Sequence, residues 1–194
     1  MIYNDRTYSA LVVSSSQKFS DSLKPMLQVA NCRTITNVSS ISSAKRSFQE
    51  HKFDYVVINT PLPDDFGTKF AIDVCNETRT VCLLIVSGDR YDEIRTKTVM
   101  HGVFVLPKPM SPVSMSRSLD FMASCRERLR SLEKKTVSIQ EKMEEIRLVN
   151  KAKWLLIENL NMTEPDAHRH IEKQAMDTCS PKKDVALEII KVYS

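Results

Sequence analysis

The stretch Lys151–Tyr193 reads KAKWLLIENLNMTEPDAHRHIEKQAMDTCSPKKDVALEIIKVY and contains three short segments with helical spacing. The first continues a preceding helix and breaks at Asn161. Thr163 is then a predicted N-cap, with acidic residues and a proline in the following turn, and Ser180 with Pro181 repeats this start signal. Apolar residues recur at helical spacing on each segment, and we expect these to face inward: Ala152, Leu155, Leu156 and Leu160; Ala167, Ile171 and Ala175; Val185, Ala186, Ile189, Ile190 and Val192. The tail 150–194 is therefore predicted to be a small all-α domain of three helices.

Upstream of this tail, the chain has no proline or glycine between Pro112 and Pro165, which predicts one long helix. Apolar residues along it alternate at spacings of three and four, and charged residues fill the intervening positions. The seam comprises Met122, Cys125, Leu129, Leu132, Thr136, Ile139, Met143, Ile146 and Asn150. The helix could instead pack on its own N-terminal domain, near Leu119 and Met122. Beyond Leu129 too little chain remains to cover the seam, so we expect a parallel homodimer, with Asn150 setting where the helices diverge.

The first 110 residues alternate short β-branched runs with segments of helical spacing. Strands are predicted at Ala10–Val13, Tyr55–Ile58, Val81–Val86 and Val103–Leu106, with a weaker one between Cys32 and Val38. This alternation predicts an α/β fold, a doubly wound five-stranded parallel sheet with helices on both faces. In such sheets, functional residues gather at the carboxyl ends of the strands.

Composition excludes several classes of protein. The content of 42% hydrophobic and 27% charged residues is ordinary for a globular chain. No apolar run is long enough to span a bilayer and the start MIYNDRTYSA lacks the pattern of a signal peptide, so we expect a cytoplasmic protein with no membrane partner. The five cysteines are scattered and form no CxxC pair, which favours reduced thiols. Neither a metal site, nor a cofactor motif, nor a catalytic residue is found, and an enzyme is not expected.

The tail resembles the ANTAR module, an RNA-binding unit of bacterial response regulators that act as transcription antiterminators. The strings AKWLL, EPDAHRHIEKQAM and DVALEIIKVY carry the resemblance, through the order and spacing of Ala152, Lys153, Ala167, Ile171, Ala175, Met176, Val185 and Ala186. From Lys151 onward, however, there are seven basic and seven acidic residues, so charge alone does not predict RNA binding. The resemblance makes five cations candidates for RNA contacts, although each could be a solvated side chain: Lys151, Lys153, Arg169, Lys173 and Lys182. His168 is expected to pack between helices and His170 to be exposed, with base stacking as the alternative for both.

The predicted sheet resembles a response-regulator receiver domain, with departures at the phosphorylation site. Where receivers have an acidic pair after the first strand, LVVSSSQ supplies Ser14 and Ser15, and where they have the phosphate-accepting aspartate, VVINTPLP supplies Asn59. Ser87 in LLIVSGD and Lys108 in LPKP match the remaining landmarks. Because an aspartyl phosphate needs a carboxylate nucleophile and a bound metal, this degenerate site is predicted not to accept phosphate. Nearby turn carboxylates, such as Asp64 and Asp65, are expected to be caps.

These observations predict a pseudo-receiver domain over 1–115, a coiled-coil dimerisation helix over 116–149 and an ANTAR domain over 150–194. The leading hypothesis is an antiterminator that binds hairpins in nascent leader RNA as a homodimer, since unpaired loops expose base edges to a few placed side chains. Its input would come from protein concentration, a regulatory protein or a ligand at the degenerate site. Two alternatives stay open, a signalling adapter that binds no RNA and a DNA-binding transcription regulator.

Overall fold

The computed structural model describes residues 6–77 and 79–193, and the chain divides into two compact units, Met1–Ser131 and Leu132–Ser194. Each unit is described by itself. Within the described residues, no helix combines the length and apolar content that crossing a membrane would require.

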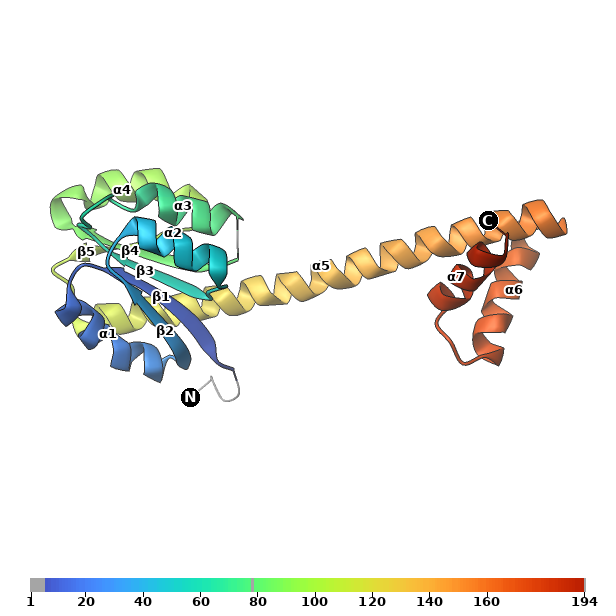
Figure 1. Ribbon diagram of the computed structural model, residues 1–194, viewed down its shortest axis with the longest axis horizontal. Helices are drawn as coiled ribbons and strands as arrows, with labels where there is room; N and C mark the ends of the chain where they lie inside the picture. Colours follow the sequence, from blue (N-terminus) through green and yellow to red (C-terminus); the bar gives the residue numbers. More distant parts are fainter. Residues whose placement is uncertain (1–5, 78, 194) are drawn as a thin grey trace. The chain divides into compact units, whose positions relative to one another are not determined.

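The N-terminal unit is built on a five-stranded parallel sheet, as predicted (Figure 1). The strand order is β2-β1-β3-β4-β5. The strands are β1 (Tyr8–Ser14), β2 (Cys32–Val38), β3 (Tyr55–Asn59), β4 (Val81–Ser87) and β5 (Phe104–Lys108). Successive side chains of a strand point to opposite faces, so β1 sends Ala10 and Val12 into one core and Leu11 and Val13 into the other.

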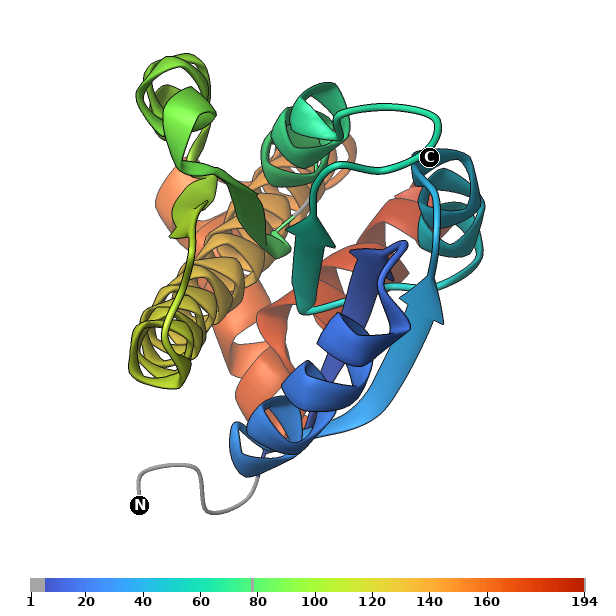
Figure 2. The ribbon, with the colours of Figure 1, turned by 90° about the vertical axis from the view of Figure 1, so that its left-hand side faces the viewer.

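Helices cover both faces of this sheet (Figure 2). One face packs against α1 (Gln17–Val29) and the first turns of α5 (Pro112–Leu160), and the other packs against α2 (Ile41–Glu50), α3 (Thr68–Glu77) and α4 (Tyr91–Thr98). Two short 3₁₀ turns, η1 (Gly88–Arg90) and η2 (Val99–His101), flank α4. The predicted doubly wound α/β fold is therefore confirmed.

The long helix α5 begins at Pro112 and ends at Leu160, immediately before the break predicted at Asn161. Its first part belongs to the N-terminal core, where Met115, Leu119 and Met122 are buried. Leu129 also packs partly against that core. The part of the predicted seam that lies on exposed helix surface therefore begins at Leu132, which is 50% exposed.

The C-terminal unit closes with the last turns of α5, α6 (Glu164–Asp177) and α7 (Lys182–Tyr193). Thr163 is the N-cap of α6, as predicted, and its hydroxyl accepts a hydrogen bond of 3.3 Å from the amide of Asp166. The chain turns between helices through left-handed residues, Asn161 at φ 53° and Cys179 at φ 50°. The core consists of Ala152, Leu156, Ala167, Ile171, Ala175, Val185, Ala186 and Ile189. The expectation that Val192 and Leu160 face this core is wrong, because their side chains are 72% and 42% exposed.

Candidate functional site

The register of the sheet brings the candidate residues of the N-terminal unit to one edge. Ser14 pairs with Asn59 across β1 and β3, and Ser87 pairs with Lys108 across β4 and β5. All four stand at the carboxyl ends of their strands, where parallel sheets carry their sites. The sheet therefore assembles the position at which a receiver would hold its phosphorylation site.

Asn59 is the centre of this edge and is 7% exposed. Its Nδ2 donates a hydrogen bond of 2.9 Å to the hydroxyl of Ser14. Its Oδ1 is buried and has no hydrogen-bond partner among the residues that the structure describes. An amide paired with a hydroxyl supplies neither a nucleophilic carboxylate nor the negative charge that would retain Mg²⁺.

Lys108 reaches toward the same edge but contacts the backbone. Its Nζ donates to the carbonyl of Thr60, and partial burial lowers the pKa of its ammonium group. Ser15 also bonds backbone, through a 3.4 Å hydrogen bond from its hydroxyl to the carbonyl of Pro61. The contacts at this edge are thus made by neutral side chains and backbone carbonyls, apart from Lys108. Lys108 is the one charged residue among the five candidate residues.

The carboxylates of the loop after β3 have structural partners. Asp64 accepts hydrogen bonds from the amides of Ile41 and Ser42 at 3.0 and 2.8 Å, and these amides lower its pKa to about 2. Asp65 accepts a 2.6 Å hydrogen bond from the amide of Gly67. Gly67 has φ 78°, and a Cβ there would lie 3.0 Å from Ile58 Cγ2, so this turn requires glycine. The expectation that these two aspartates act as caps is confirmed.

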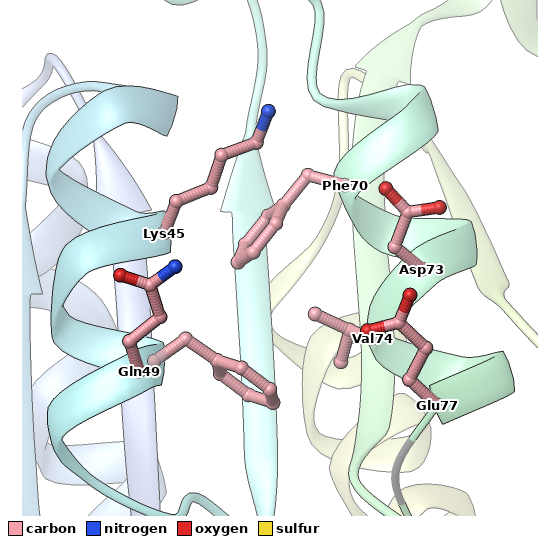
Figure 3. A pocket seen from close by; sticks show the side chains of 7 residues that line it. Lys45, Gln49, Phe70, Asp73, Val74 and Glu77 are labelled. Carbon is pink, nitrogen blue, oxygen red and sulfur yellow. The ribbon is translucent and has the colours of Figure 1, made fainter.

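Two hollows lie elsewhere on the N-terminal unit. One, of about 180 Å³, lies between α2 and α3, with Phe48, Phe70 and Val74 at its apolar wall and Lys45, Gln49, Asp73 and Glu77 around it (Figure 3). The other, of about 450 Å³, is lined by α1 and the start of α5: Phe19, Ser22, Leu23, Met26, Met110, Ser111, Pro112 and Met115. Neither is lined by Ser14, Ser15, Asn59, Ser87 or Lys108.

In the C-terminal unit, three of the five candidate cations form ion pairs. Lys153 lies 2.6 Å from Glu164 and joins α5 to α6, while Lys182 lies 2.6 Å from Glu172 and joins α7 to α6. These lysines lower the pKa of Glu164 and of Glu172. Arg169 lies 3.3 Å from Asp166 on its own helix.

The other two candidates, Lys151 and Lys173, are exposed and form no ion pair with any described residue. His168 is exposed as well, with its Nε2 3.3 Å from Glu172, so the expectation that it packs between helices is wrong. The imidazole lies beside Glu172 at the surface, and Ala167, Ile171 and Ala175 fill the helix interface in its place.

The surface of α5 in this unit carries a row of exposed apolar side chains. Leu132, Ile139, Met143 and Ile146 are between 50% and 66% exposed, and Asn150 follows on the same face. Sequence reasoning missed Trp154, which is 70% exposed. Its position was readable, because a residue two places from both Ala152 and Leu156 points away from the face that those residues bury.

The ANTAR domain family model matches residues 138–190, which span the end of α5 together with α6 and α7. The chain thus combines a five-stranded α/β fold in its N-terminal unit with a match to the ANTAR domain in its C-terminal unit. A similar curated protein is the transcriptional regulatory protein PdtaR of Mycobacterium tuberculosis, 26% identical over 141 residues that cover 73% of this chain and 69% of PdtaR.

Solved receiver structures resemble the N-terminal part of the chain. The chemotaxis response regulator CheY4 of Vibrio cholerae covers 60% of this chain and 99% of its own, with a TM-score of 0.52 and 18% identity. The receiver domain protein of Clostridium thermocellum covers 63% of this chain and 98% of its own, with a TM-score of 0.55 and 17% identity. At these identities the likeness establishes the receiver fold alone.

Proposed function

We propose that this chain is an RNA-binding transcription antiterminator, which binds hairpins in nascent leader transcripts as a homodimer and whose receiver domain does not accept phosphate. The match of residues 138–190 to the ANTAR domain is the observation that carries this proposal. The similarity to a transcriptional regulatory protein agrees with the broader statement that the chain regulates transcription. The division into 1–115, 116–149 and 150–194 remains part of the same proposal.

We call the three-helix domain of residues 150–194 the head. Because its basic and acidic residues are equal in number, RNA recognition by the head depends on the positions of individual side chains and not on its net charge. Lys151 and Lys173 are exposed and can approach phosphates directly. Lys153, Arg169 and Lys182 each have a carboxylate neighbour, so RNA would have to share or replace that partner. Such a head suits a hairpin loop, whose unstacked bases are read by a few hydrogen bonds and stacking contacts.

Dimerisation is supported by the exposed row Leu132, Ile139, Met143 and Ile146 on α5. Isolated apolar residues are common on protein surfaces, but a row at heptad spacing between charged positions is typical of a coiled-coil seam. A parallel pairing through this row would link two heads, which raises the effective concentration of the second head once the first has bound.

The loss of phosphate acceptance is supported by the contacts of Asn59 and by the neutral hydroxyls of Ser14 and Ser15. Without a carboxylate in this set there is no phosphate acceptor, and Mg²⁺ has no charged ligand. Regulation would then pass through protein concentration, a partner protein or a ligand at the degenerate edge.

The proposal is tested by gel shift of the whole protein against a pool of hairpin RNAs with randomised loops, unstructured RNA and duplex DNA. The wild-type protein is expected to bind a subset of the hairpins and shift them in the gel. The double variant Lys151→Ala/Lys173→Ala should weaken retention about tenfold or more. The matched control Lys134→Ala/Lys191→Ala removes the same charge from exposed sites outside the candidate set and should bind as wild type.

The alternative of a protein-binding adapter is favoured by one observation, the pairing of Lys153, Arg169 and Lys182 with carboxylates. Those pairs leave a head with little free positive charge. Absence of any hairpin retention at micromolar protein would favour the adapter, whereas equal retention of duplex DNA would favour a DNA-binding regulator.

A further inference from the structure

Trp154 is the one tryptophan of this chain, and its side chain is 70% exposed on the surface of the C-terminal unit. Its neighbours Ala152 and Leu156 are 0% and 1% exposed in the core of that unit, so the ring points away from that core. An indole is among the most costly side chains to leave in water, because it carries up to about 250 Å² of largely apolar surface. The fold of the head therefore gives no reason for tryptophan at this position.

The ring lies on the same face of α5 as the exposed apolar row. At about 100° per residue, Trp154 lies at one edge of this row, roughly 20° around the helix from Met143 and roughly 40° from Leu132 and Asn150. It lies roughly 60° from Ile139 and roughly 80° from Ile146. These positions belong to one unit of the chain and to one uninterrupted helix. The row of exposed apolar residues thus continues past Asn150 onto the head itself.

The heptad spacing cannot continue past Asn150 in its original phase. The next two seam positions would be Lys153 and Ile157, but Lys153 is 17% exposed and bound to Glu164, and Ile157 packs against the core of the head. Trp154, four residues after Asn150, is the apolar residue that remains available. From Met143 the row therefore continues at spacings of three, four and four, through Ile146 and Asn150 to Trp154. Eleven residues in three turns give a period of about 3.67, which is close to the roughly 3.6 of a straight helix, where the heptad period is 3.5.

From these observations we infer that a second copy of this chain covers Trp154, so that the two indole rings meet beside the Asn150 side chains at the head end of a parallel dimer. This inference rests on the proposed homodimer and adds a contact made by the heads themselves. In a parallel pairing, equivalent residues of the two helices face each other across the axis. Alignment through Met143 consequently brings the two copies of Trp154 close together.

The length of the seam supports a second copy as the occupant of this face. The exposed row Leu132–Ile146 covers about two heptads, or roughly 22 Å of helix, whereas stable coiled coils usually sustain three or four heptads. Inclusion of Asn150 and Trp154 extends the row to roughly 35 Å. The indole also adds the largest single apolar surface of the row.

Fluorescence of the single tryptophan tests this inference without any substitution. The full chain is diluted in the absence of RNA, and the emission maximum of Trp154 is recorded beside the molecular mass from analytical ultracentrifugation. We expect emission of a buried indole in the dimer and of a water-exposed indole in the monomer, with the two transitions at the same concentration. A dimer whose indole emits as in water, and shifts only when hairpin RNA is added, would overturn the inference and assign Trp154 to RNA.

Variants provide the second measurement. Trp154→Ala should raise the dimer dissociation constant about tenfold or more, and Trp154→Phe should recover most of the affinity. Met176→Ala, which truncates another exposed apolar residue of the head at 71% exposure, is the matched control and should not change it. Equal dissociation constants for Trp154→Ala and wild type would contradict the inference. A protein that stays monomeric at every concentration would instead reject the proposed homodimer, and the inference with it.

Discussion

Asn59 occupies the position on which the proposed loss of phosphate acceptance depends. Its amide donates to Ser14, and Ser15 bonds a backbone carbonyl, so a carboxylate introduced at position 59 would still lack acidic neighbours for a metal. We expect Asn59→Asp to stay unphosphorylated by acetyl phosphate and Mg²⁺, as judged by intact mass spectrometry.

The triple variant Ser14→Asp/Ser15→Asp/Asn59→Asp replaces all three groups and should bind Mg²⁺ and gain a phosphoryl group. Binding of Mg²⁺ is measured by calorimetry and phosphorylation by mass spectrometry. Stoichiometric phosphorylation of the wild-type protein would show that another carboxylate serves as acceptor and would reject the pseudo-receiver.

Asp64 makes a second prediction at this scale, from its position at the start of α2. Its folded-state pKa of about 2 lies below its ordinary value of 3.8, because the amides of Ser42 and Ile41 stabilise the carboxylate. A lowered pKa contributes stability above the unfolded-state value, and this contribution is lost as the pH falls through the folded-state value. Asp64→Ala should therefore unfold at lower temperature at neutral pH, and the difference from wild type should shrink between pH 3.8 and about 2.

Thermal unfolding followed by circular dichroism at several pH values measures this difference. Asp21→Ala is a suitable control, since its carboxylate accepts a side-chain hydrogen bond from Gln17 on an exposed helix surface and none from a backbone amide of the described residues. A difference between wild type and Asp64→Ala that does not change with pH would contradict the capping role.

At the scale of single elements, a largely buried ion pair connects α5 to the amino end of the sheet. Arg126 Nε lies 2.9 Å from Asp54 Oδ1, with side chains 13% and 14% exposed, and Arg130 lies 3.4 Å from the same oxygen. The other oxygen of Asp54 accepts hydrogen bonds from the amide and hydroxyl of Ser9. One carboxylate thus joins β1, the start of β3 and the helix that leads out of this unit.

Asp54→Ala should lower the free energy of unfolding of this unit by roughly 3 kcal/mol, because it leaves a largely buried guanidinium without its carboxylate. Urea unfolding followed by circular dichroism at pH 7 measures the loss. Glu127→Gln is the control, since Glu127 is 33% exposed and paired with Arg6 and Arg130 near the surface, where an ion pair contributes less than about 1 kcal/mol. Equal losses in the two variants would contradict the buried role of Asp54.

The strands and helices were predictable where a local sequence pattern, such as an apolar run or an N-cap residue, determines them. Runs such as Tyr55–Ile58 and Val81–Val86 are buried strands, and Thr163 caps α6 because a hydroxyl at that position satisfies a free amide of the first turn. Periodicity indicates the apolar face of a helix but not how far a neighbouring helix covers it. Val192 consequently lies exposed one turn beyond the buried Ile189–Ile190 region.

The ion-pair partners of the charged residues could not be predicted from the sequence, because they also depend on how the helices pack. Glu164 and Glu172 lie eleven and ten residues from Lys153 and Lys182, and only the packing of three helices brings these charges within 2.6 Å. The net charge of zero in the head could be counted from the sequence. Which acidic residue pairs with which lysine depends on the tertiary structure. Asn59 could be matched to the phosphate-acceptor position only through the resemblance to receiver domains, and its contact with Ser14 needed the strand register.

At the scale of the whole molecule, the proposed homodimer predicts that RNA affinity depends on the number of hairpins, because it would link two heads. An RNA with two hairpins at a suitable spacing should bind the wild-type dimer about 100-fold or more tighter than an RNA with one, because the second contact is intramolecular. The seam variant Ile139→Glu/Met143→Glu places charges on exposed residues of the row, so each head should remain folded while the dimer dissociates. It should bind both RNAs with the weaker, single-hairpin affinity.

Fluorescence anisotropy with labelled RNA measures both affinities at a protein concentration above the dimer dissociation constant of the wild type. Glu141→Lys/Gln140→Glu, which alters exposed positions beside the row without changing an apolar residue, is the control and should retain the preference for two hairpins. A preference that survives in the monomeric seam variant would mean that one head reads both hairpins. The coiled coil would then position the protein without supplying avidity.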